Sequence, residues 1–177
     1  AADNDISQEQ AAWAIVAPDA KEAMFKHAER LHAAGIPFIF DLGQAMPLFD
    51  GNDLAAMMKL ARVLTANDYE MAVIEQRMAK PVDELAKDLE AIIVTLGGAG
   101  SVLYHEGEKI TIEPVTPTAI EDPTGCGDAH RAGVLYGLAA GWSWLDSARL
   151  GNVMGSIKVA VGGPQNHRPS LEEIQSI

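Results

Sequence analysis

The stretch Ile36-Pro-Phe-Ile-Phe-Asp-Leu42 is an apolar run with one carboxylate near its end, a pattern typical of a strand buried on both faces. Before it, apolar side chains recur on one helical face between Asp19 and Ala34, and Gly35 ends that helix. After it, Asn52 or Asp53 is expected to cap another helix. A buried strand between two helices predicts a layered α/β fold.

The alternation of strand and helix continues along the chain. Four further segments are expected as a strand, two helices and a strand, at residues 63–65, about 69–78, 82–89 and 91–96. Such alternation favours a mainly parallel sheet flanked by helices, a Rossmann-like three-layer α/β/α arrangement. Ligands of such sheets usually lie beyond the C-terminal strand ends, where Asp41, Asn67 and Gly97 fall.

The pattern changes after residue 100. Residues 101–104 and 109–112 flank His105-Glu106-Gly107-Glu108 like the strands of an antiparallel hairpin, which we expect at an edge of the sheet. Three helices are expected to follow, at residues 127–140, at residues 144–161 and after a capping box of Ser170 with Glu173. Because no repeat or linker interrupts the chain, residues 1–177 are predicted to form a single α/β domain.

Composition bounds the possible functions. The 177 residues are 48% hydrophobic and 21% charged, as expected of a soluble globular chain. A net charge of −12 argues against nucleic-acid and anionic-membrane partners. The lone Cys126 excludes an internal disulfide, so a reducing compartment, the cytoplasm, is expected. We expect neither a secretory leader nor a membrane span, which would need roughly 20 apolar residues.

The phrase Asp122-Pro-Thr-Gly-Cys-Gly-Asp-Ala129 precedes an apolar helical pattern and points to chemistry. Glycines let a backbone approach a ligand closely, and the amides of a helix's first turn then aim at an anion. Asp128, beside them, is placed to orient a hydroxyl and to accept its proton as it attacks phosphorus. The alternative is a glycine-rich helix cap with a solvated aspartate.

Two more phrases, Asn67-Asp-Tyr-Glu70 and Thr95-Leu-Gly-Gly-Ala-Gly100, precede that motif. In this order the three resemble the phosphofructokinase-B-type, or ribokinase-like, sugar kinases over nearly the whole chain. With Asp41-Leu-Gly-Gln44 and Arg131-Ala-Gly133, they look most like bacterial adenosine kinases. The resemblance implies ATP-dependent phosphoryl transfer to a nucleoside or sugar hydroxyl, with adenosine as the first candidate acceptor and ribose or a related furanose as the alternative.

The resemblance also implies roles for single residues. Asp128 would be the catalytic base, and the amides of Gly125, Cys126 and Gly127 would form the anion hole. Asn67 and Glu70 resemble a pair that tunes Mg²⁺, largely through water. An ordinary helix start, with Asn67 as the cap, is the alternative interpretation of that pair.

The nucleotide and a monovalent cation would have their own residues. Four residues of the loop after the strand at 91–96 resemble the place where ATP lies: Thr95, Gly97, Gly98 and Gly100. Asn152 matches a position that contacts adenine. Asp122 and Thr124, with the bend at residues 159–164, match a possible K⁺ site, although the same two residues also suit a simple turn.

The chain departs from the family pattern in three respects. His130 stands where relatives usually carry phenylalanine, and Leu42 where they usually carry proline. Relatives also begin with a strand-rich half that supplies a lid and the groups that grip the sugar. The chain therefore resembles the nucleotide-side half, without a lid domain, and Ala1–Gln10 resembles the tail of the other half.

An exposed sheet edge would recruit that missing half or a second copy of the chain. A non-catalytic nucleotide-binding fragment is the remaining alternative.

Overall fold

The computed structural model describes residues 11–175, so the interpretation of residues 1–10 lies outside the described part. The chain divides into two compact units. The N-unit comprises Ala1–Val94 and Tyr104–Lys109, and the C-unit comprises Thr95–Leu103 and Ile110–Ile177. The chain thus passes from one unit to the other three times. The single-domain organisation stays a prediction.

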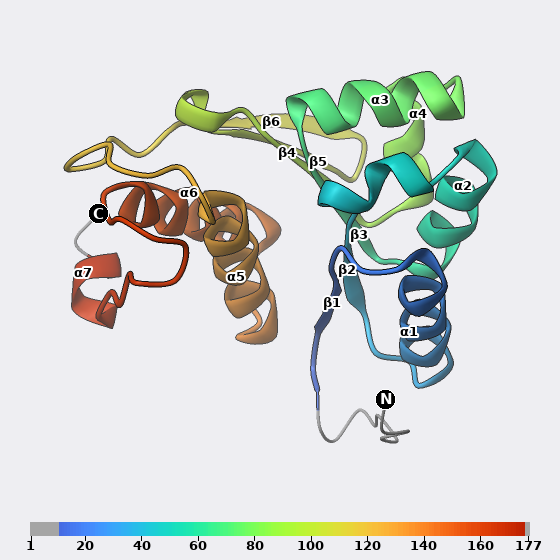
Figure 1. Cartoon of the computed structure of the whole chain (residues 1–177), viewed down its shortest axis with the longest axis horizontal. Coiled ribbons are helices and arrows are strands. Elements are labelled where there is room, and N and C mark those ends of the chain that lie inside the picture. The colour runs from blue at the N-terminus through green and yellow to red at the C-terminus, as the bar shows by residue number, and fades with distance from the viewer. Residues whose placement is uncertain (1–10, 176–177) are drawn as a thin grey trace. The chain divides into compact units, whose positions relative to one another are not determined.

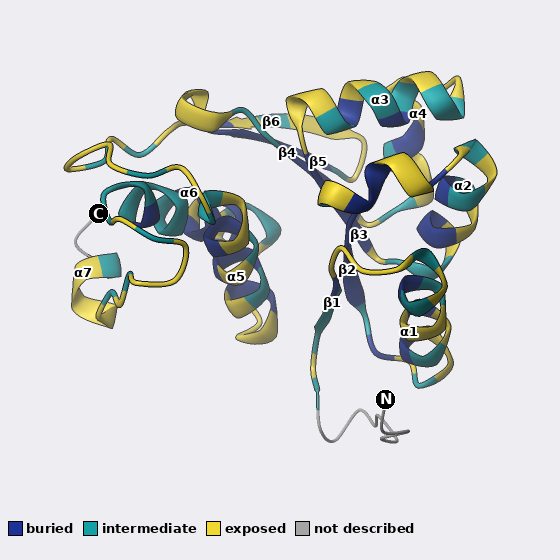
Figure 2. Cartoon of the chain, viewed as in Figure 1, coloured by how far each residue is buried: buried dark blue, intermediate teal, exposed yellow. Residues whose placement is uncertain are grey.

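A six-stranded sheet follows the order of the chain (Figure 1). Its strands are β1 (Ala14–Val16), β2 (Phe38–Asp41), β3 (Val63–Asn67), β4 (Ala91–Thr95), β5 (Ser101–His105) and β6 (Glu108–Ile112). β2 pairs in parallel with both β1 and β3, and this register sets Asp41 opposite Thr65. All four residues of β2 are buried, as expected for a strand covered on both faces (Figure 2).

The predicted hairpin is confirmed, and β6 is the last strand of the sheet. Glu106 and Gly107 form its two-residue turn with φ values of 52° and 80°. Two positive φ values are characteristic of the type I′ turn, whose twist matches that of the flanking strands. The α/β fold, mainly parallel with an antiparallel edge, is therefore the predicted one.

The N-unit adds α1 (Lys21–Ala33), α2 (Gly51–Leu60), α3 (Asp68–Met78) and α4 (Val82–Leu85), with 3-10 turns η1 (Gly43–Leu48) and η2 (Ala86–Asp88). Two expectations were wrong in detail. The cap of α2 is Asp50, whose side chain accepts hydrogen bonds from the amides of Asn52 and Asp53 at 2.8 and 2.9 Å. The helix expected to reach residue 89 ends at Leu85, where the backbone tightens into η2.

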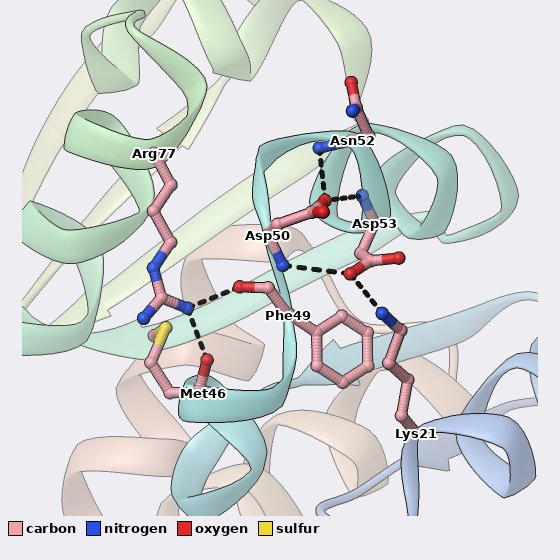
Figure 3. Close-up of polar contacts among 7 residues, drawn as sticks. All are labelled: Lys21, Met46, Phe49, Asp50, Asn52, Asp53 and Arg77. Carbon is pink, nitrogen blue, oxygen red and sulfur yellow. Dashed lines mark hydrogen bonds and ion pairs between the residues drawn. The ribbon is translucent and has the colours of Figure 1, made fainter.

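Phe49 is the centre of a cluster that joins several elements of the N-unit (Figure 3). Its side chain is buried, and its ring centroid lies 5.8 Å from that of Phe25 and 6.0 Å from that of Phe40. Arg77 of α3 donates hydrogen bonds to the carbonyls of Met46 and Phe49. Helix α1 is connected as well, because Lys21 lies over the Phe49 ring and pairs with the carboxylate of Asp53 in α2.

The C-unit contains the 3-10 turn η3 (Gly97–Ala99) and the helices α5 (Cys126–Ala139), α6 (Trp144–Val159) and α7 (Leu171–Gln175). The predicted capping box of α7 is present, with reciprocal bonds of 2.7 and 3.2 Å between Ser170 and Glu173. In the described range, no helix has the length and hydropathy needed to cross a bilayer.

Helices α5 and α6 lie side by side (Figure 1), and small residues let them pack closely. A Cβ atom added to Gly133 of α5 would lie 2.8 Å from the carbonyl oxygen of Leu150 in α6. One added to Gly137 would lie 2.5 Å from the Ser147 hydroxyl oxygen. Such separations are shorter than van der Waals contact, so larger side chains would force the helices apart.

His130 fills part of this helix interface. Its side chain is buried, and its ring atoms lie 2.8–2.9 Å from the position of a Cβ atom on Gly151. Burial, aided by the charge of Arg131, lowers the pKa of His130 from its usual 6.5 to about 4. A neutral ring packed in this way explains how histidine occupies a place where an aromatic residue was expected. Leu42, the other departure, is fully buried.

We predict that Gly133→Ala destabilises the protein by roughly 1–3 kcal/mol, because the new methyl group meets backbone atoms that cannot turn aside. Gly155→Ala in α6 is the matched control: its Cβ would meet only the Cys126 carbonyl at 3.8 Å, so helix propensity should dominate and stability should rise slightly. Urea unfolding followed by circular dichroism measures both. Equal stability of the two variants would refute the close contact.

We also predict that His130→Phe flattens the dependence of stability on pH. Because the folded-state pKa is lowered, the stability linked to His130 is complete above pH 6.5 and is lost as pH falls towards about 4. The loss amounts to roughly 3 kcal/mol at most. Unfolding free energies measured from pH 7.5 to 4.5 test this, with the exposed His27→Gln as the control. An unchanged slope in His130→Phe would contradict the prediction.

Candidate active site

The entrance of α5 is shaped by Gly125. This residue caps the helix with a φ of 85°, and a Cβ atom on it would lie 2.7 Å from the carbonyl oxygen of Pro164. Both the backbone conformation and the close contact require glycine. The helix therefore begins at a fixed point against the bend that follows α6.

Two of the three predicted anion-hole amides are open. The Cys126 amide donates to the Pro123 carbonyl at 3.1 Å, within the turn before the helix. For the amides of Gly125 and Gly127, no described residue supplies an acceptor. Such amides at a helix start can bind an anion. Burial raises the pKa of the Cys126 thiol, which suits a packing role rather than a nucleophile.

Asp128 presents a carboxylate in the first turn of α5. Its side chain is 77% exposed, and its Oδ1 atom accepts a hydrogen bond from Arg131 Nη2 at 2.6 Å. The same guanidinium borders Gly127, where an added Cβ would lie 3.2 Å from Arg131 Nη1. A carboxylate, a guanidinium and open amides thus lie together at the start of α5, and this combination can bind a phosphoryl group and accept a proton.

Asp122 and Thr124 form the turn that leads into this helix. Asp122 Oδ1 accepts from the Thr124 amide at 2.9 Å, and Oδ2 accepts from the Gly163 amide at 2.9 Å. The hydrogen bonds from Thr124, followed by that from Gly163, lower the pKa of Asp122 to about 2. The carboxylate therefore stays ionised and ties residues 122–124 to the bend after α6.

The glycine-rich loop also belongs to the C-unit. Gly97, with a φ of 57°, begins η3, and neither it nor Gly98 has atoms near the position of a Cβ. A Cβ on Gly100, in contrast, would lie 2.2 Å from the carbonyl oxygen of Ile112. Thr95 ends β4 directly before this loop. Open space at Gly97 and Gly98 fits the predicted approach of a nucleotide, which stays a prediction.

Asn152 of α6 is engaged within the protein. Its Nδ2 donates to the carbonyls of Ile112 and Glu113 at 3.3 and 3.0 Å, and its Oδ1 accepts from the Ser101 hydroxyl at 3.0 Å. The side chain is buried. It thus fastens α6 to the strands beside it, and its contact with adenine stays a prediction.

Asn67 and Glu70 belong to the N-unit and form the capping box of α3. Asn67 Oδ1 accepts from the Glu70 amide at 2.8 Å, and Glu70 Oε2 accepts from the Asn67 amide at 2.9 Å. The helix-start interpretation is therefore confirmed. In the described part of the chain, no three His, Cys, Asp or Glu side chains gather as metal ligands. The role of this pair towards Mg²⁺ stays a prediction.

Two cations near the site were not assigned a role from the sequence. Arg131 entered the resemblance only as part of the stretch Arg131-Ala-Gly133. Its spacing of three residues from Asp128 on a helix nevertheless favours an ion pair. Lys158 was expected only as part of the helix at residues 144–161, yet it is fully buried and its ammonium donates to the Asp122 carbonyl. No local pattern indicated the contact between Lys158 and Asp122, because these two residues are distant in the sequence.

Solved structures resemble this chain closely. A nucleoside kinase from Burkholderia thailandensis in complex with inosine superposes with a TM-score of 0.90 and 41% identity, over 93% of this chain and 55% of that one. The same kinase is also known in complex with ADP-inosine. An adenosine kinase from Sinorhizobium meliloti superposes with a TM-score of 0.74 and 25% identity, over 90% of this chain and 49% of the other.

Sequence comparison agrees. The nucleoside kinase of Methanocaldococcus jannaschii is 29% identical over 135 residues, which are 76% of this chain and 45% of that protein. The chain thus spans about half the length of these relatives. The sequence profile described as "pfkB family carbohydrate kinase" matches residues 3–171. Because that match covers almost the whole chain, the chain belongs to the pfkB family of carbohydrate kinases.

Proposed function

We propose that the protein containing this chain transfers a phosphoryl group from ATP to a nucleoside hydroxyl. The observation that carries the proposal is the first turn of α5, where the open amides of Gly125 and Gly127 lie beside the exposed carboxylate of Asp128. Phosphoryl transfer depends mostly on positioning and on donors arranged in advance around the charged group. This turn supplies both a base and such donors.

Each group of the turn has a distinct task. Asp128 accepts the proton of the attacking hydroxyl. The Arg131 guanidinium orients the Asp128 carboxylate by donating a hydrogen bond to its Oδ1 atom. The amides of Gly125 and Gly127 stabilise the negative charge that builds up on the phosphoryl oxygens. Gly97 and Gly98 leave room for the nucleotide.

Magnesium would neutralise part of the charge on the phosphates of ATP. Glu70 fits a water-mediated role: only its Oε2 atom takes part in the capping box, and no described residue bonds to its other carboxylate oxygen. Magnesium usually keeps several waters, so one carboxylate is a sufficient protein contribution.

A purine nucleoside is the proposed acceptor. This choice rests on the kinase that was solved with inosine, which resembles the chain at 41% identity, compared with 25% for the adenosine kinase. We therefore extend the acceptor from adenosine to inosine and related nucleosides, with attack by the 5′-hydroxyl. Ribose or another furanose remains the alternative acceptor.

A second candidate function is nucleotide binding without transfer. The open amides of Gly125 and Gly127 and the space beside Gly97 and Gly98 would serve nucleotide binding alone equally well. Calorimetric titration with ATP and magnesium, beside a coupled kinase assay, separates the two functions. Binding without turnover of any nucleoside or sugar would favour the second, and absence of binding would contradict both.

We predict that Asp128→Asn, made in the protein that contains this chain, lowers kcat by 10²-fold or more while ATP affinity changes little, because the base acts only on the acceptor. The matched control is Asp146→Asn: Asp146 forms the equivalent ion pair with Arg149 in α6 at 3.2 Å. Turnover of inosine, adenosine and ribose is measured for each variant. Substantial turnover by Asp128→Asn would disprove the assignment of the base.

A further inference from the structure

Lys158, in the last turn of α6, is a charged residue with no solvent exposure. Its Nζ atom donates hydrogen bonds to the carbonyl oxygens of Asp122 and Val161, each at 2.9 Å. Removing an ammonium group from water is costly unless polar groups replace its hydration. The two backbone carbonyls that accept these hydrogen bonds therefore form a binding site for the ammonium cation.

The ammonium lies where three segments of the C-unit meet. Residues 121 and 122 also donate their amides to the Val159 carbonyl, at 2.8 and 3.2 Å. The carboxylate of Asp122 accepts a hydrogen bond from the Gly163 amide. Pro164, in the same bend, lies in close contact with Gly125. The cation thus fastens the end of α6 to the turn that positions the proposed anion hole.

This bend is where the family resemblance led us to expect a potassium ion, and its residues do not fit one. Potassium is bound by carbonyl oxygens that replace its hydration shell. Here the Lys158 ammonium lies 2.9 Å from the carbonyl oxygens of both Asp122 and Val161, so a potassium ion on the same oxygens would meet a like charge at close range. Both carboxylate oxygens of Asp122 also accept backbone amides.

We infer that the Lys158 ammonium is the resident cation of this bend and that the protein needs no monovalent metal ion there. A covalently attached cation is present at every concentration of salt, so the turn before α5 keeps its shape without an ion from solution. The inference goes beyond the proposed function: it concerns the order of the bend and holds whether the bound nucleotide reacts or not.

Thermal unfolding in potassium chloride and in choline chloride of equal ionic strength tests the inference. The chain with Lys158 should have the same Tm in both salts, and its affinity for ATP with magnesium should not change. Lys158→Ala should lower Tm by roughly 5 °C or more in choline chloride, because buried carbonyls lose their donor. Potassium should restore part of that loss, since the vacated carbonyls can then coordinate it.

Two controls complete the experiment. Lys158→Met keeps most of the bulk without the charge, and should be destabilised equally in both salts because the side chain leaves no room for the ion. Lys59→Ala removes an exposed lysine from α2 and should behave as the unmodified chain.

A higher Tm or tighter ATP binding of the unmodified chain in potassium chloride would overturn the inference. So would an equal loss of Lys158→Ala in both salts. If the Lys158 variants fail to fold, a potassium titration of the unmodified chain decides alone, because any stabilisation specific to potassium would refute a resident ammonium.

Discussion

The contact between Gly125 and Pro164 is the constraint from which the arrangement of the proposed catalytic residues in the C-unit follows. The first amides of a helix have no partner within the helix, and the positive φ of Gly125, which glycine adopts without strain, sets how the backbone enters α5. Pro164 then fixes the position of the turn from outside the helix. The carboxylate of Asp122 and the ammonium of Lys158 hold the two backbone segments at that separation. The open amides are thus arranged before any ligand arrives.

The N-unit relies on a different kind of constraint, a large buried ring. The Phe49 ring packs on aromatic rings from α1 and β2. Its carbonyl oxygen accepts a hydrogen bond from the Arg77 guanidinium of α3. The hydrophobic effect and dispersion hold α1 and β2 against the Phe49 ring, and the directional hydrogen bond from Arg77 connects α3 to the Phe49 backbone. The parallel register of β2 and β3 then brings the ends of both strands to the same edge.

Local patterns in the sequence predicted most of the fold. The apolar run at 36–42 and the turn at Glu106-Gly107 carry their own physical signals, burial and backbone handedness. The cap of α2 was misjudged because several adjacent residues suit a cap equally, and the choice depends on tertiary contacts. One is the carbonyl of Arg77, which would lie 2.3 Å from a Cβ on Gly51. Lys158 was missed for the same reason, since its partner Asp122 lies in another segment.

The β5–β6 hairpin has a consequence for how such a protein can be divided. β5 begins in the C-unit and β6 ends in it, whereas Tyr104–Lys109, which include the turn between the two strands, belong to the N-unit. One break in the chain therefore cannot separate the units, because each unit is made from two stretches of sequence. Recombination that exchanged either unit as a module would have to cut and rejoin the gene at several points.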